Sequence, residues 1–285
     1  MRAFMKRFAT ITVIGKDKTG VIARVTNYLF EQRANIEALE EQVTRGQFSM
    51  TLQASWEPKL FAPSVLGEGL QALARDLKME IKMRSFDPKR PQRAAIMVTK
   101  EPHCLQGLLG AFKAGKLNAE PVVVISNRDD LKDLAETFAL PFVSIPTADR
   151  AEAERQALLE LEQREIDFVI LARFMKILSP NFVWRYKNKI INIHPSLLPG
   201  FPGAQAYRQA YERGVKVIGV TAHFVTMHLD EGPIIAQDCF PVKPEMTLKD
   251  IVAEGQKLET KVLIEAVRLY LTKRLDVYWG IVKQV

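Results

Sequence analysis

Apolar residues recur with regular spacing through the first 86 residues of the chain. Residues 9–15 read ATITVIG and predict a strand. Val21, Val25 and Leu29 lie four residues apart after a turn at residues 17–20, and this spacing predicts a helix. The pattern continues with extended segments at residues 35–43 and 47–56, a helix that begins at Pro63, and a last strand at residues 79–86. The order β-α-β-β-α-β predicts a ferredoxin-like domain over residues 1–86.

Residues 87–93 read DPKRPQR, and this polar, proline-interrupted stretch predicts a linker. After it, short apolar runs alternate with helical stretches. These runs occupy residues 94–98, 121–126, 168–171 and 190–193. Continuous apolar runs suit strands that are buried on both faces, so we expect an open, mostly parallel α/β sheet over residues 94–285. Ligands of such sheets bind outside the carboxyl ends of the strands.

Composition narrows the class of protein further. The chain has two cysteines, with no disulfide framework and no zinc-like spacing, so we expect a cytoplasmic protein. No leader pattern and no apolar run of about 20 residues is present, so we expect no membrane partner. The net charge is +7, but lysine and arginine are scattered among acidic residues. We therefore expect no nucleic-acid partner, although a positive field would favour an anionic small molecule.

One stretch, INIHPSLLPGFPG at residues 191–203, predicts a site rather than a structural element. Asn192 and His194 are two residues apart in a strand, so their side chains share a face where the strand enters a Pro/Gly-rich loop. A later loop contains Asp230, and the pair Gly232-Pro233 closes it before another strand. A surface turn would also use Asp and Gly in this way.

We expect other polar residues near this stretch to have structural and not catalytic roles. We expect His223 to be a satisfied core histidine, because its neighbours in the strand at residues 217–225 are apolar. No H-x-H spacing supports a metal site, so none is predicted from His194, His223 and Asp230. Ser196 lacks a nucleophile elbow, and we expect its hydroxyl to satisfy backbone groups of the loop.

The second domain resembles the formyltransferase fold family that handles 10-formyltetrahydrofolate. The segments that carry this resemblance are NIHPSLLP, GVTAHFV and LDEGPII, together with ARFMKILS at residues 172–179. The resemblance covers nearly all of residues 94–270. It implies a catalytic trio of Asn192, His194 and Asp230, a folate as substrate, and no separate cofactor. The folate-binding residues that it implies are Met175, Lys176, Ile177, Leu178, Thr226 and Gly232.

The segment DKTGVIA at residues 17–23 resembles the start of ACT regulatory domains. This resemblance implies an amino-acid effector site at a dimer interface between sheets, and therefore a homo-oligomer. The effector residues that it implies are Asp17, Gly20, Asn35 and Ile36. Alternatively, Gly20 only permits a tight turn, and the domain serves dimerisation alone.

An ACT domain joined to a formyltransferase domain resembles the deformylase branch of the family. This branch hydrolyses 10-formyltetrahydrofolate to tetrahydrofolate and formate, which balances one-carbon pools and supplies purine biosynthesis. Relatives that formylate glycinamide ribonucleotide use a Gly-Ser-Asn phosphate loop, whereas VTKEPHCL at residues 98–105 has no glycine. Pro195 and Leu197 stand where many deformylases carry His and Phe. The alternatives are a formyltransferase with an amine acceptor and a folate-binding amino-acid sensor without turnover.

Overall fold

The computed structural model describes residues 6–86, 90–272, 275–278 and 280–284. The chain divides into two compact units, Met1–Arg90 and Pro91–Val285. Residues 87–89 of the predicted linker lie outside the described residues, and the last two linker residues, Gln92 and Arg93, belong to the first strand of the second unit. None of the helices in the described ranges is long and apolar enough to cross a membrane.

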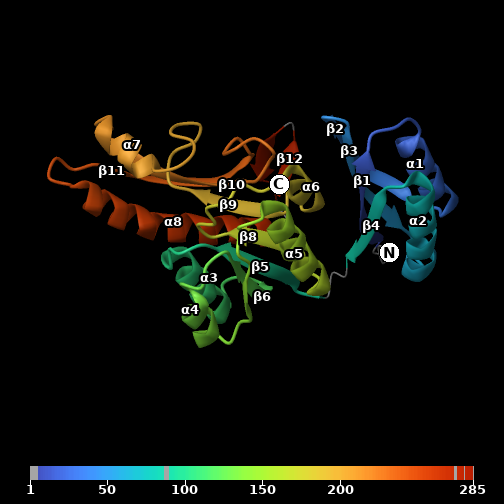
Figure 1. Ribbon diagram of the computed structural model, residues 1–285, viewed down its shortest axis with the longest axis horizontal. Helices are drawn as coiled ribbons and strands as arrows, with labels where there is room; N and C mark the ends of the chain where they lie inside the picture. The colour runs from blue at the N-terminus through green and yellow to red at the C-terminus, as the bar shows by residue number, and fades with distance from the viewer. Residues whose placement is uncertain (1–5, 87–89, 273–274, 279, 285) are drawn as a thin grey trace, which may run out of the picture. The chain divides into compact units, whose positions relative to one another are not determined.

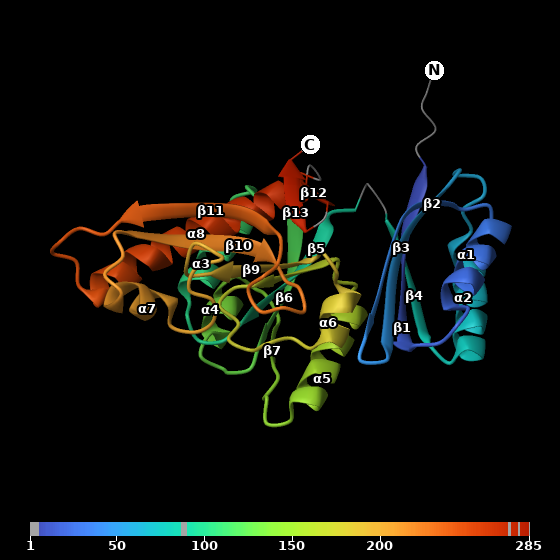
Figure 2. The ribbon, with the colours of Figure 1, turned by 90° about the horizontal axis from the view of Figure 1, so that it is seen from above.

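The first unit has the predicted ferredoxin-like order. Its elements are β1 (Arg7–Lys16), α1 (Val21–Glu31), β2 (Asn35–Thr44), β3 (Gln47–Trp56), α2 (Pro63–Leu77) and β4 (Glu80–Phe86). The strands form an antiparallel sheet in the order β2-β3-β1-β4, and both helices cover one face of it (Figure 2). Val21, Val25 and Leu29 of α1 are fully buried against this sheet, as their spacing predicted.

The two segments of the predicted effector site lie at opposite ends of this sheet within one chain. The loop after β1 lies beside the β2–β3 turn, where Asp17 N donates to Gly46 O at 2.9 Å. Asn35 and Ile36 begin β2 at the other end, where Asn35 pairs with Ser55. A ten-residue strand separates the two ends, a length of roughly 30 Å. The effector residues therefore do not meet within one copy of the chain.

The second unit is built on a seven-stranded sheet in the order β11-β10-β9-β8-β5-β6-β7. Its strands are β5 (Gln92–Val98), β6 (Ala119–Ser126), β7 (Phe142–Ser144), β8 (Phe168–Leu171), β9 (Ile190–His194), β10 (Val217–Phe224) and β11 (Ile234–Pro241). The pairs from β9 through β7 are parallel, and β10 runs antiparallel to β9 and β11. The prediction of a mostly parallel sheet is confirmed.

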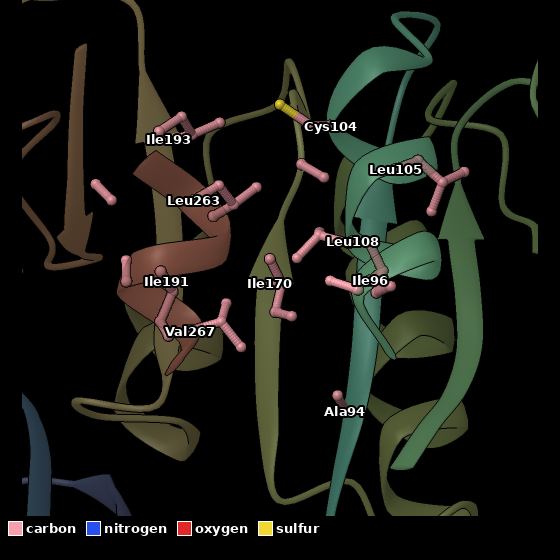
Figure 3. Packing of buried hydrophobic residues seen from close by; sticks show 14 of the residues in the cluster. Ala94, Ile96, Cys104, Leu105, Leu108, Ile170, Ile191, Ile193, Leu263 and Val267 are labelled. Carbon is pink, nitrogen blue, oxygen red and sulfur yellow. The ribbon is translucent and has the colours of Figure 1, made fainter. Parts of the chain in front are cut away.

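Helices cover both faces of this sheet (Figure 1). They are α3 (His103–Lys113), α4 (Lys132–Thr137), α5 (Arg150–Gln163), α6 (Pro180–Arg185), α7 (Ala206–Glu212) and α8 (Leu248–Leu271). Alternate strand residues such as Ile96, Ile170 and Ile191 pack with α3 and α8 on one face (Figure 3). Their neighbours in sequence pack with α5 and α6 on the other. The buried strands therefore lack the alternation of apolar and polar residues that a half-exposed sheet shows.

Three short strands were absent from the sequence-based prediction. β7 has only three residues, too few for a periodic signal. β12 (Leu275–Tyr278) and β13 (Ile281–Gln284) form a separate antiparallel pair after α8.

Candidate active site

The end of β9 presents the first two residues of the site. Asn192 and His194 project from the same face of the strand, and β10 runs alongside with His223 opposite Asn192 and Thr221 opposite His194. His194 is only 4% exposed, whereas Asn192 is half-buried. The strand pairing therefore brings a second histidine, from β10, to the face that carries Asn192 and His194.

Asp230 reaches this face from the loop that follows β10. Its backbone adopts φ 57°, a left-handed conformation that Asp tolerates better than most residues. The carboxylate accepts from Gly203 N at 2.8 Å, and its Oδ2 lies 3.3 Å from His194 Nδ1. Its side chain is 7% exposed, so solvent screens this contact weakly. The structure thus brings together Asn192, His194 and Asp230.

Both ring nitrogens of His194 face oxygen acceptors. Nε2 lies 2.9 Å from Phe201 O, and a carbonyl oxygen only accepts hydrogen bonds. Nδ1 faces the Asp230 carboxylate, which accepts as well. The imidazole is therefore held between the Phe201 carbonyl and the Asp230 carboxylate. These two contacts fix the orientation of the ring in the site.

His223 is a neutral imidazole. It is 2% exposed, and this burial is the main cause that lowers its pKa, so the ring is neutral near pH 7. Its Nδ1–H donates to Phe224 O at 2.9 Å, which leaves Nε2 as an acceptor for Asn192 Nδ2 at 3.2 Å. This bond orients the Asn192 amide and leaves its second N–H and its oxygen for a ligand. The expected core histidine is thus also a positioning residue.

The loop after His194 is tied to the neighbouring strands. The Ser196 hydroxyl donates to Gly200 O, as expected of a residue that satisfies the loop backbone. Thr221 of β10 donates to Ser196 O at 2.7 Å and accepts from Leu198 N at 3.0 Å. These bonds hold the loop whose Phe201 carbonyl and Gly203 amide orient His194 and Asp230.

A cavity of about 580 Å³ opens at the carboxyl ends of β8 and β9. The trio lines it together with five of the six expected folate residues: Met175, Lys176, Ile177, Leu178 and Thr226. Large apolar side chains at its rim are exposed, with Met175 at 51%, Ile177 at 60% and Leu229 at 51%. Such exposure next to convergent polar groups is typical of a ligand-binding cleft.

Gly232, the sixth expected folate residue, is not among the residues that line the cavity. It is buried, and a Cβ at this position would lie 1.6 Å from Phe224 O. The backbone N–H of Phe224 donates to Pro233 O at 2.9 Å, so the two chain segments are in direct backbone contact. Gly232 therefore shapes the loop that carries Asp230.

Helix α5 forms hydrogen bonds with the segment of residues 173–179. Arg150 donates to Ile177 O at 2.8 Å, and Ser179 N donates to Glu154 Oε1 at 2.7 Å. Arg150 and Glu154 also pair with each other at 3.7 Å. These two hydrogen bonds fix the backbone of a segment that forms neither a strand nor a helix.

The same segment is held once more at Met175, whose N–H donates to Thr99 Oγ1 at 3.0 Å. The Thr99 hydroxyl in turn donates to Asn127 Oδ1 at 2.9 Å. Within the described part of the chain, no hydrogen bond uses the backbone N–H or C=O of Lys176 or Leu178. Their backbone groups are therefore available to a ligand with its own donors and acceptors.

His103, Cys104 and Glu259 form a group of metal-ligating type, with ligand atoms within 4.8 Å of one another, and Glu259 also lines the cavity. Burial raises the pKa of the Cys104 thiol, which keeps its proton. The Glu259 carboxylate already accepts from His103 and Tyr207. The Glu259 carboxylate is thus satisfied by protein groups, and the Cys104 thiol is protonated.

Comparison with known proteins agrees with both units. The ACT domain family matches residues 7–84, and the formyl transferase family matches residues 92–267. A formyltetrahydrofolate deformylase of Escherichia coli (strain K12) is 40% identical over 272 residues, which cover 94% of this chain and 95% of that protein. The fold and the site therefore define a protein with a formyl transferase domain and an attached ACT domain.

Solved structures extend the comparison. A formyltetrahydrofolate deformylase from Burkholderia mallei ATCC 23344 is 34% identical, covers 98% of this chain and 99% of its own, and has a TM-score of 0.66. Glycinamide ribonucleotide transformylase 1 from Symbiobacterium toebii is 32% identical with a TM-score of 0.67, but covers only 70% of this chain and 96% of its own. The chain belongs to the formyltetrahydrofolate deformylase family.

Sequence reasoning missed two groups of residues that support the site. His223 was interpreted as a core residue, and its bond to Asn192 depends on the pairing of β9 with β10. Arg150 and Glu154 lie on an ordinary charged helix, and nothing in their spacing indicates a contact with residues 177 and 179. No local sequence signal was available for either contact.

Proposed function

We propose that the protein hydrolyses 10-formyltetrahydrofolate to tetrahydrofolate and formate. The observation that carries this proposal is the trio of Asn192, His194 and Asp230 in the lining of a cavity of about 580 Å³. The likeness to deformylases along 94% of the chain supports water as the acceptor.

The trio supplies what hydrolysis of a formamide needs. The free N–H of Asn192 and the protonated ring of His194 stabilise the negative charge that develops on the formyl oxygen. The Asp230 carboxylate keeps the ring protonated and orients the attacking water. The water oxygen bonds to the formyl carbon, the bond from that carbon to N10 breaks, and the proton that the water loses is delivered to N10 through the His194–Asp230 pair.

The substrate lies between residues 175–178 and the loop at residues 226–232 in this proposal. The free backbone groups of Lys176 and Leu178 pair with donors and acceptors of the pterin, while Ile177 covers an apolar ring face. Met175 and Thr226 complete the walls, and Gly232 shapes the loop from behind.

The decisive experiment measures formate from purified protein and 10-formyltetrahydrofolate with no amine present. We expect formate and tetrahydrofolate in equal amounts. A protein that releases formate only after an amine acceptor is added would be a transferase. Binding of folate without any turnover would favour the sensor hypothesis.

The ACT domain is proposed to bind an amino acid between two copies of the chain. Asp17 and Gly20 of one copy would meet Asn35 and Ile36 of the other, because these pairs lie at opposite ends of one sheet. β2 is an edge strand, and its exposed apolar side chains include Val43 at 47% and Ile36 at 38%, which suits pairing with a second copy. Light scattering and calorimetry with common amino acids test this. A monomer that binds none of them refutes it.

We also propose a cytoplasmic location and a supply of formate to purine biosynthesis. Both cysteines are free, with Cys104 buried and Cys239 exposed, which suits a reducing compartment. Growth of a deletion strain with and without added formate tests the metabolic role.

A further inference from the structure

The cavity contains a buried carboxylate that the trio does not use. Glu259 of α8 is 0% exposed and lines the same cavity as Asn192 and His194. Its Oε1 accepts from the Tyr207 hydroxyl at 2.7 Å, and its Oε2 lies 3.0 Å from His103 Nε2. A buried carboxylate with this many partners requires an explanation, because burying a charge is costly.

The Arg173 guanidinium also lies close to this carboxylate, with its Nε 3.4 Å from Glu259 Oε2. Burial acts to raise the pKa of Glu259, but the bonds from His103 and Tyr207 and the charge of Arg173 outweigh it and hold that pKa below its ordinary value. Glu259 is therefore ionised, and its charge is balanced within the protein. The four residues are called the Glu259 network below.

The Glu259 network joins four separate parts of the second unit. His103 begins α3, Arg173 follows β8, Tyr207 lies in α7 and Glu259 lies in α8. A neutral, apolar set of side chains would join these parts at least as stably, because a buried ion pair is seldom worth its desolvation cost. Stability alone therefore does not account for the network.

The position of the network indicates what it does for the reaction. The lining of the cavity includes Arg173, Tyr207 and Glu259. Arg173 directly precedes the segment at residues 174–178, and its backbone has a left-handed φ of 64°. The network therefore lines the same cavity in which the trio lies and in which we place the folate. A second reactant that reaches the formyl carbon through this cavity passes the network.

We propose that the Glu259 network excludes acceptors larger than water: Glu259 holds the Arg173 side chain in the space through which an amine would reach the formyl carbon. This inference rests on the proposed hydrolytic function. Water fits beside the network and attacks the carbon, whereas a primary amine is blocked by the guanidinium group. Arg173 and Glu259 are thus specificity-determining residues for the same reaction.

The reaction that the network prevents is formyl transfer. In that reaction the amine nitrogen bonds to the formyl carbon, the bond from that carbon to N10 breaks, and one proton of the amine passes to N10. The products are an N-formyl amine and tetrahydrofolate, with no formate. The trio would support this step as well as hydrolysis, because in both reactions negative charge develops on the formyl oxygen of a tetrahedral adduct.

The test compares Arg173→Ala with the wild-type protein in the presence of 10-formyltetrahydrofolate and either hydroxylamine or glycinamide. The measured quantity is the ratio of N-formyl amine to formate. This ratio does not depend on how much of the protein is folded or on the overall rate. Arg208→Ala is the matched control, since Arg208 is an exposed arginine that lines the same cavity and has no contact with Glu259.

We expect the ratio to rise at least about tenfold in Arg173→Ala and to stay at the wild-type value in Arg208→Ala. An unchanged ratio in an Arg173→Ala protein that still hydrolyses the substrate overturns the inference, and so does an equal rise in the control. If Arg173→Ala does not fold, Arg173→Ala combined with Glu259→Gln removes both buried charges and is judged by the same ratio. Wild-type protein that needs an amine to react contradicts the proposed function itself, so the two failures are distinguishable.

Discussion

Replacing Asp230 by Asn isolates the charge of the carboxylate from its shape. Asn tolerates the left-handed backbone at φ 57°, and its side-chain oxygen still accepts from Gly203 N. The fold and the affinity for folate should therefore be retained. The change removes the negative charge that lies 3.3 Å from His194 Nδ1.

The expected loss follows from this distance. At an effective dielectric constant of about 20, opposite unit charges 3.3 Å apart interact by about 5 kcal/mol. Relaxation and the remaining hydrogen bonds reduce this value. Losing one preorganised group in an active site costs about 3–4 kcal/mol, so kcat should fall by about two to three orders of magnitude.

The assay measures formate release at saturating 10-formyltetrahydrofolate, with folate affinity measured separately by calorimetry. Asp238→Asn is the matched control, because this β11 aspartate is partly exposed and pairs with Lys261, whose side chain is exposed. Its kcat should match that of the wild type. Near-normal hydrolysis by Asp230→Asn would refute the role assigned to the carboxylate, and a parallel loss in the control would point to a general effect of lost charge.

Three further predictions concern residues that support the trio. The lowered pKa of His223 means that the unfolded chain binds more protons than the folded one below about pH 6.5, so the free energy of unfolding should fall as the pH drops through this range. His223→Gln should weaken that dependence in thermal melts at several pH values, and a wild-type dependence in the variant would contradict this origin. Gly232→Ala should destabilise the protein by at least about 2 kcal/mol in denaturant unfolding, because the new Cβ would meet a backbone carbonyl at 1.6 Å; an unchanged midpoint would refute the close approach. Glu154→Ala should raise KM for the folate about tenfold with little change in kcat, since the segment at residues 175–178 loses a charged anchor. Glu152→Ala, an exposed change on the same helix, should leave both constants unchanged, and equal effects of the two would reject the anchor.

The sequence by itself determined the local elements and the type of each unit. The four-residue spacing of Val21, Val25 and Leu29 requires a helix with one apolar face, and that helix forms. Continuous apolar runs at β5, β6, β8 and β9 require strands that are covered on both faces, and the parallel sheet meets this requirement. The side-by-side projection of Asn192 and His194 follows from the twofold repeat of a strand.

Only the tertiary structure decided how distant segments meet. The antiparallel pairing of β10 with β9 places His223 against Asn192, and the packing of α8 brings Glu259 to Arg173 across the cavity wall. Residues 86 positions apart, as Arg173 and Glu259 are, share no local periodicity, since local patterns report only which face of an element is apolar. Which faces then pack together, and which polar groups meet there, depends on burying apolar surface over the whole unit while each enclosed donor, acceptor and charge finds a partner.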